Sequence, residues 1–173
     1  SFKPDFADAY NNLGNVFKQQ GKLDEAIEAF NKALSLKPDY AEVYKNMGVA
    51  LTNIIFKKPN RELQNTIVSL LDKERYIRPK DIATAAISLL KFEPSLQKQL
   101  KFVSCNKVIQ NPLDIISDLD KLPLLRNLMS VCPLPDLELE TLFTNLRASI
   151  LENISSLKEA SPELLRFQSA LAL

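Results

Sequence analysis

Apolar residues recur every three or four positions along most of the chain, the spacing of a helix that buries one face. In residues 7–20 this apolar stripe contains Tyr10, Leu13 and Phe17. No segment alternates apolar and polar residues as a half-buried strand does. The pattern therefore predicts an all-α protein.

A period of 34 residues relates the first helix to a later one. ADAYNNLGNVF at residues 7–17 aligns with AEVYKNMGVAL at residues 41–51. The paired positions are Tyr10 with Tyr44, Asn12 with Asn46, Leu13 with Met47, and Gly14 with Gly48. FKPDF at residues 2–6 likewise matches LKPDY at residues 36–40. We therefore expect that the chain starts in the last residues of an earlier repeat, since repeats of this length stack on one another.

The first repeat reads as a helical hairpin. Gly14 has no side chain, so a second helix can approach the first closely, and Gly21 suits a left-handed helix cap. Asp24 favours the start of the second helix, and Pro38 ends it. The expected packing face of the second helix is Ala26, Phe30 and Ala33.

These residues give residues 1–52 a close resemblance to the tetratricopeptide repeat (TPR) family. The matching signature positions are Leu13, Gly14, Phe17, Ala26, Phe30, Ala33 and Pro38. The resemblance implies a helical solenoid that binds a peptide or a partner protein in a groove lined by the first helix of each hairpin. It also implies a scaffold or adaptor that is not an enzyme.

The repeat breaks after residue 51, but helical spacing continues to the end. Further helices are expected over residues 60–73, from Pro79, from Pro94 to about Val103, over residues 113–130 with a break near Pro123, after a cap at Asp136, and from Ser161 to Leu173. We expect a TPR region at residues 1–55. Residues 56–173 are then an irregular α-helical bundle that caps the solenoid.

A second, weaker resemblance concerns residues 78–96 and 111–125. They are similar to the region that precedes the catalytic domain in bacterial TPR–methyltransferase proteins. This resemblance implies an alternative function, a substrate-recruiting or regulatory region of a larger S-adenosylmethionine-dependent methyltransferase. Because the chain stops within the apolar sequence LLRFQSALAL, we expect a fragment of a longer protein.

Composition argues against catalysis. The chain has no histidine, which removes the usual general base and the usual zinc ligand, and its three glycines all precede residue 49. No glycine-rich phosphate loop is therefore possible beyond that point, and we expect no cofactor and no metal. Cys105 and Cys132 are expected to be buried, reduced thiols of a cytoplasmic protein. The net charge of +1 and the lack of a long apolar run indicate neither a nucleic-acid nor a membrane protein.

The best candidate site is the groove of the first helices. The expected groove residues are Asn11, Asn12, Asn15, Lys18, Lys45, Asn46 and Val49, with Asn11, Asn15 and Lys18 exposed on the first helix. Asn12 and Asn46 resemble the asparagine ladder with which some TPR proteins hold a peptide backbone, since an amide both donates and accepts. The alternative is that both are simply solvated. Some TPR proteins instead clamp the C-terminal carboxylate of a chaperone. Such a clamp is disfavoured here because Asn11 occupies a position where those proteins have lysine.

Two charged clusters have weaker functional interpretations. Lys57, Lys58, Arg61, Lys73, Arg75, Arg78 and Lys80, with Phe56 and Tyr76 nearby, suit RNA contact or, as we expect, solvated helix faces. Asp114, Asp118 and Asp120 suit a magnesium ion or, as we expect, helix caps and solvent. The basic middle of the chain, residues 53–110, and its acidic C-terminal part, residues 111–173, could also attract each other. A homodimer through the uncapped first helix is possible, because a solenoid end exposes apolar surface.

Overall fold

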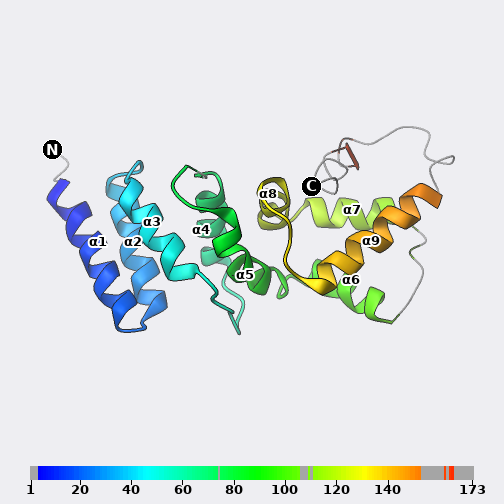
Figure 1. The fold of residues 1–173 in the computed structure, drawn as a ribbon, viewed down its shortest axis with the longest axis horizontal. Coiled ribbons are helices and arrows are strands. Elements are labelled where there is room, and N and C mark those ends of the chain that lie inside the picture. Colours follow the sequence, from blue (N-terminus) through cyan, green and yellow to red (C-terminus); the bar gives the residue numbers. More distant parts are fainter. Residues whose placement is uncertain are drawn as a thin grey trace.

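The structure is a computed structural model that describes residues 4–73, 75–105, 109, 111–152, 162, 164 and 165. These residues form helices and connecting segments, with no strand among them, which confirms the all-α prediction. The helices are α1 (Pro4–Gln19), α2 (Leu23–Leu36), α3 (Ala41–Leu51), α4 (Arg61–Leu71), α5 (Pro79–Leu90), α6 (Pro94–Ser104), α7 (Pro112–Asp120), α8 (Pro123–Val131) and α9 (Leu137–Glu152). They are spread along the long axis of the molecule, with α1 near one end and α6, α7 and α9 near the other (Figure 1).

The first hairpin, α1 and α2, packs as the sequence predicts. Ala26, Phe30 and Ala33 are fully buried. A Cβ atom added at Gly14 would lie 2.5 Å from the Phe30 ring, so only glycine allows this approach of the two helices. Gly21 has a φ of +73° and ends α1 in the left-handed conformation expected of it.

One part of the predicted apolar stripe on α1 is wrong. Leu13 is 41% exposed, because the buried face of α1 consists of Ala7, Asn11 and Gly14, at helical spacing. Tyr10 and Phe17 lie at the margin of this face and are half-buried. The side of α1 that carries Leu13 and Val16 is an exposed apolar surface.

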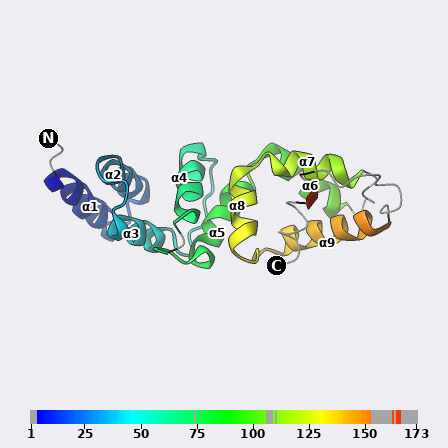
Figure 2. The same cartoon turned by 90° about the horizontal axis from the view of Figure 1, so that it is seen from above.

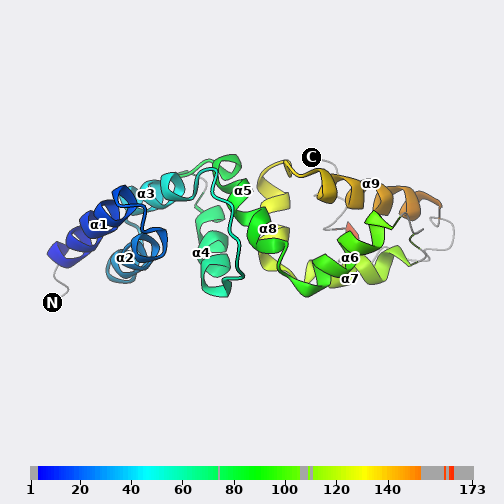
Figure 3. The same cartoon turned by 90° about the horizontal axis from the view of Figure 1, so that it is seen from below.

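The next helices continue two layers. α1, α3 and α5 form one layer, and α2 and α4 form the other (Figure 3). Neighbours within the first layer are in contact, α1 with α3 and α3 with α5. In the second layer, Asn31 of α2 donates a hydrogen bond to Thr66 of α4 over 3.3 Å. The solenoid therefore runs past residue 51, where the sequence repeat ends.

α8 has the neighbours that the second helix of a third hairpin would have. It packs against both α4 and α5, although 32 residues lie between the end of α5 and its own start. Leu124, Leu125 and Leu128 are buried there, and Asn127 donates a hydrogen bond to Asp72 over 3.2 Å. In Figure 2, α8 lies between the two layers and the group of α6, α7 and α9.

The group of α6, α7 and α9 forms the far end of the molecule (Figure 2). Asp136 caps α9, since its carboxylate accepts a hydrogen bond from the Leu139 amide over 3.1 Å. The same carboxylate is 2.7 Å from the ammonium of Lys91, which also lies 2.7 Å from Glu138. An attraction between the basic middle and the acidic C-terminal part is thus present within one chain.

The predicted helix starts at Pro79 and Pro94 and the break at Pro123 are confirmed, and the cap at Asp136 is the observed one. The helix expected over residues 161–173 falls largely outside the described residues. The division at residue 55 stays a prediction. Buried residues on both sides of it belong to one hydrophobic core.

Candidate protein-interaction site

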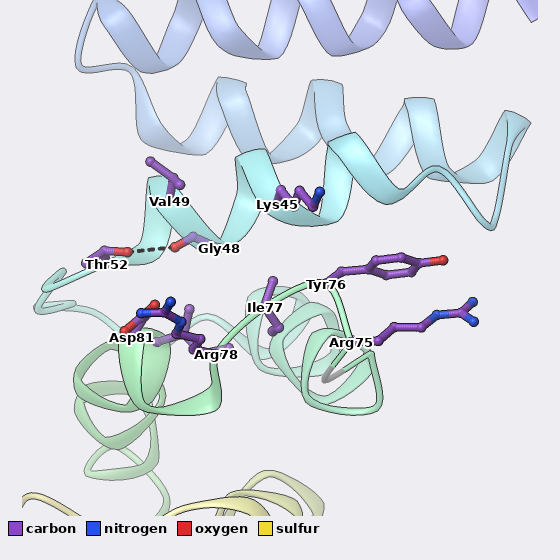
Figure 4. A pocket seen from close by; sticks show the side chains of 10 residues that line it. Lys45, Gly48, Val49, Thr52, Arg75, Tyr76, Ile77, Arg78 and Asp81 are labelled. Atoms are coloured by element: carbon purple, nitrogen blue, oxygen red, sulfur yellow. Dashed lines mark hydrogen bonds between the residues drawn. The ribbon is translucent and has the colours of Figure 1, made fainter.

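A hollow of about 430 Å³ opens between α3 and α5. One wall is α3 with the residue after it, and the other is the segment 75–78 with the first turn of α5 (Figure 4). The lining residues are Lys45, Gly48, Val49, Thr52, Arg75, Tyr76, Ile77, Arg78, Asp81 and Ile82. We call this feature the α3–α5 hollow.

Ile77 fixes the distance between the two walls. Its side chain points toward α3 at Gly48, where an added Cβ would lie 2.9 Å from the Ile77 Cγ2 atom (Figure 4). Ile77 is buried, so the hollow has an apolar centre. The segment 75–78 is thus held against α3 through a close contact that glycine permits.

Aromatic stacking holds the same segment at its start. The rings of Tyr44 and Tyr76 stack with centroids 5.7 Å apart, and the Tyr44 hydroxyl donates a hydrogen bond to the Pro38 carbonyl over 2.7 Å. The Arg75 guanidinium lies 4.6 Å from the centre of the Tyr76 ring. Such contacts restrict the side chains that line one end of the hollow.

The lining of the hollow is positively charged. It contains Lys45, Arg75 and Arg78 against one carboxylate, that of Asp81. All three cations are exposed, and none forms an ion pair with a carboxylate of the described residues. The hollow therefore presents cationic groups that solvent or a ligand can reach.

A second hollow, of about 330 Å³, lies between α2 and α4 and has the opposite charge. Its charged lining residues are Asp24, Glu28 and Glu62. The Glu28 carboxylate already pairs with Lys32 at 2.7 Å, which lowers the pKa of Glu28 through the hydrogen bond and the positive charge. The two helix layers thus carry hollows of opposite charge.

The predicted groove residues divide into two groups. Lys45 and Val49 are exposed and line the α3–α5 hollow. Asn11, expected to be exposed, is 2% exposed, because α3 covers it. Its side-chain oxygen accepts a hydrogen bond from the Asn46 amide over 2.9 Å, so these two asparagines join α1 to α3.

The remaining groove residues lie on α1. Asn12 is exposed, while Asn15 and Lys18 are half-buried, less open than expected. The Asn15 side-chain oxygen is buried and has no hydrogen-bond donor among the described residues. Asn12 and Asn46 differ in their surroundings despite their equivalent repeat positions, and the asparagine ladder stays a prediction.

The predicted basic cluster does not form one surface at the hollow. Of its seven cations, only Arg75 and Arg78 line it. Lys73 lies 3.7 Å from Asp39, and Phe56 packs against the core. The sequence predicted solvated helix faces for these cations, with RNA contact as the alternative, whereas the fold brings Arg75 and Arg78 beside the predicted groove residues Lys45 and Val49.

The other predicted chemistry is not assembled in the described residues. No group of three histidine, cysteine, aspartate or glutamate side chains there could hold a metal ion, so Asp114, Asp118 and Asp120 do not form one. Asp118 pairs with Lys121 at 3.1 Å. Cys132 is buried as expected, and burial raises the pKa of its thiol. Cys105 is exposed, which contradicts the expectation of two buried thiols.

Sequence reasoning missed the contribution of Thr52, Ile77 and Asp81 to the hollow. A signal was present at Gly48. The first repeat pairs its glycine with Phe30, but nothing aromatic occupies the matching place in α4, whose buried residues are Leu63, Ile67 and two leucines. In the structure the apolar partner of Gly48 is Ile77, from the segment after α4.

Comparison with known proteins identifies the first hairpin. Residues 7–40 match the family model described as tetratricopeptide repeat. No solved structure matches the chain. The methyltransferase resemblance of residues 78–96 and 111–125 finds no support in these comparisons. Among the described helices, none has both the length and the apolar character needed to cross a membrane. The chain therefore contains a tetratricopeptide repeat, at residues 7–40, at the start of an all-helical solenoid.

Proposed function

We propose that this protein is a non-catalytic interaction module that binds a partner protein along the layer of α1, α3 and α5. The observation that carries the proposal is the α3–α5 hollow, which is lined on one side by a repeat helix, α3, and on the other by the segment after α4. TPR hairpins generally mediate protein–protein interaction, and a hollow of this size accepts several side chains of a bound peptide.

Exposed side chains along the layer support this role. Val49 is 64% exposed at the edge of the hollow, although it is an apolar residue of a packed helix. Asn12 and Lys18 lie on α1 in the same layer and offer polar contacts to a peptide that extends beyond the hollow. Six of the seven predicted groove residues thus enter the proposal. Four of them, in two groups, are contacts, and Asn11 and Asn46 support these by joining α1 to α3.

The methyltransferase alternative has no observation in its favour, and we do not propose it. The cytoplasmic location of the protein stays a prediction.

Site-specific photo-crosslinking tests the proposed surface. A photoreactive amino acid at Val49 is expected to capture a discrete partner from a cell extract, because this position faces the hollow. The matched control is the same amino acid at Ser35, which is exposed on α2 in the other layer. Capture from Ser35 but not from Val49 would mean that partners use the opposite layer.

We also propose that the exposed stripe of α1 pairs with a second copy of the chain. Leu13 and Val16 form its apolar centre. An antiparallel pair of α1 helices would bring the exposed side chains of Leu13 and Val16 in one copy against those of the other and remove them from water. This two-fold arrangement is the commonest symmetry of homo-oligomers.

Light scattering after gel filtration measures the oligomeric state. The double variant Leu13→Lys with Val16→Lys is expected to be a monomer where the wild-type chain is a dimer. Leu137→Lys is the control, because Leu137 is an equally apolar and 77% exposed residue on α9. A wild-type chain that remains monomeric at high concentration would rule the dimer out.

A further inference from the structure

We infer that the α3–α5 hollow binds an acidic peptide, a segment of a partner protein in which carboxylate side chains flank an apolar one. This inference rests on the proposed function and names the chemistry of the partner. The charge, the apolar centre and the aromatic contacts of the hollow support it.

The charge of the hollow selects an anionic occupant. Among the described lining residues, three cations against one carboxylate give a net charge of +2, in a chain whose total is only +1. Since Lys45, Arg75 and Arg78 lack partners among the described carboxylates, a bound acidic side chain gains a contact without breaking one. Arginine in particular holds a carboxylate through two parallel hydrogen bonds.

The positions of the cations match a peptide rather than a single ion. In Figure 4, Arg75 and Arg78 extend in opposite directions on the two sides of Ile77, and Lys45 lies on the opposite wall. One small anion cannot reach both arginines. Acidic side chains at two separate positions of one peptide can.

The apolar centre gives the peptide a third contact. Val49 on one wall and Ile77 at the centre are aliphatic, and Thr52 lies on the same wall as Val49. The Thr52 hydroxyl is occupied, because it donates a hydrogen bond to the Gly48 carbonyl over 2.9 Å. An aliphatic side chain between the two acidic ones would bury the exposed surface of Val49.

An RNA strand fits the hollow less well. Sequence-tolerant RNA binding uses aromatic rings on which bases stack. The Tyr76 ring already contacts the Tyr44 ring and the Arg75 guanidinium, and Phe56 packs against the core. The cations Lys57, Lys58 and Arg61 do not line the hollow. The hollow therefore offers charge without a stacking surface.

Selection from a random library of displayed dodecapeptides tests the inference on the full chain. Immobilised wild-type protein is expected to enrich peptides with two acidic residues flanking an aliphatic one. The best enriched peptide is then synthesised with a fluorescent label, together with a version in which each Asp becomes Asn and each Glu becomes Gln. The uncharged version is expected to bind at least about tenfold more weakly, since the charge-assisted hydrogen bonds are lost.

Variants locate the binding. Lys45→Gln with Arg78→Gln is expected to weaken binding of the acidic peptide by about tenfold or more. Lys57→Gln with Lys58→Gln removes the same charge outside the hollow and is expected to change the affinity less than about twofold. Circular dichroism checks that both variants fold. The comparison of acidic and uncharged peptides needs no variant, so it decides the question even if one variant misfolds.

The outcomes separate the inference from the proposed function. Enriched peptides without acidic residues, or acidic peptides that bind the hollow variant normally, would overturn the inference and leave peptide binding intact. Failure to enrich any peptide would remove both. A competition with RNA tests the remaining alternative. The competitor is a random-sequence RNA of about 12 nucleotides, the length of the displayed peptides, and the unlabelled acidic peptide is the reference. If the RNA displaces the labelled peptide at a lower concentration than the reference does, the inference is overturned in favour of nucleic acid.

Discussion

The two glycines at equivalent repeat positions contact different kinds of partner. Gly14 faces the ring of Phe30 on the neighbouring helix α2, whereas Gly48 faces Ile77 on a connecting segment. The same residue type at the same repeat position thus serves a helix pair in one case and a loop–helix contact in the other. This difference predicts unequal tolerance to a methyl group.

Gly14→Ala is expected to lower the free energy of unfolding by up to about 2 kcal/mol. The added Cβ meets three ring atoms of Phe30 within 2.9 Å, and Phe30 is fully buried. Overpacking costs about 1–3 kcal/mol, which exceeds the gain of about 1 kcal/mol from replacing glycine in a helix. Gly48→Ala meets one methyl group of Ile77 below 3 Å and is expected to cost less. Urea unfolding compares the two variants, and a more damaging Gly48→Ala would contradict this ranking.

Asn11 and Asn15 predict a second contrast. Asn11→Ala leaves the Asn46 amide without its acceptor between α1 and α3, which costs about 1–3 kcal/mol. Asn15→Ala removes a buried oxygen that has no donor among the described residues, so the variant is expected to be as stable as the wild type or more stable. Chemical denaturation of the two variants checks this. Equal losses would mean that Asn15 makes a contact of similar strength.

Tyr40 predicts a pH dependence at the junction of α2 and α3. The pKa of Tyr40 is raised to about 12 from an ordinary value of 10.0. The largest cause is the hydrogen bond to Asp8, and the second is burial. Because the folded pKa is the higher one, the contribution of Tyr40 to stability is complete below about pH 10 and is lost as the pH rises toward about 12. The stability difference between wild type and Tyr40→Phe should therefore shrink over this range. A difference that stays constant with pH would refute the assignment.

At the scale of helices, the sequence predicted which segments are helical and where they begin better than it predicted which helices contact one another. Prolines at positions 79, 94, 112 and 123 each start a helix, because proline is preorganised for the first turn and lacks only an amide that needs no partner there. Three of these starts, or the breaks that they cause, could be predicted. The apolar stripes also indicated which faces are buried, as Ala26, Phe30 and Ala33 demonstrate.

Contacts between distant segments could not be predicted from spacing alone. Nothing local indicates that α8 packs on α4 and α5, since any amphipathic helix with leucines on one face would fit that description. The α3–α5 hollow had the same difficulty. Lys45 and Val49 were expected in a groove, but Arg75 and Arg78 join them only through the path of the segment after α4.

The start of α9 offers a test at this scale. Asp136→Ala removes both the cap on the Leu139 amide and the ion pair with Lys91, and is expected to cost about 1–2 kcal/mol. Glu138→Gln removes an ion pair of the same lysine but no cap, and its exposed side chain should contribute under about 0.5 kcal/mol. Thermal unfolding of the two variants separates these effects. A larger loss from Glu138→Gln would show that the ion pair dominates.

For the whole molecule, the continuous core predicts that the repeat region depends on the helices after it. Tyr44, Met47 and Leu51 of α3 belong to the same core cluster as Ile77 and the apolar face of α5. The fragment of residues 1–55 would expose that face of α3, because Ile77 and α5 no longer cover it. Fully burying one such side chain is worth about 1.5–3 kcal/mol, whereas a whole domain is stable by only about 5–15 kcal/mol.

The fragment of residues 1–55 is therefore expected to lack a cooperative thermal transition, whereas the full chain should unfold with one. Circular dichroism at the helical band measures both. The control is a fragment of residues 1–91, which retains α5 and Ile77 over α3 and should recover part of the transition. Cooperative unfolding of residues 1–55 alone would instead support an independent domain that ends at residue 55.

The position of α8 has a consequence for synthesis on the ribosome. α1 and α2 can pair as soon as both have emerged, because their contacts are local in sequence. The apolar faces of α4 and α5, by contrast, remain without α8 until residue 131 has left the exit tunnel. At a synthesis rate of about 5–20 residues per second, the 41 residues from the end of α5 to the end of α8 leave those faces open for roughly 2–8 s. During that interval the nascent chain offers chaperones an apolar surface that the finished protein hides.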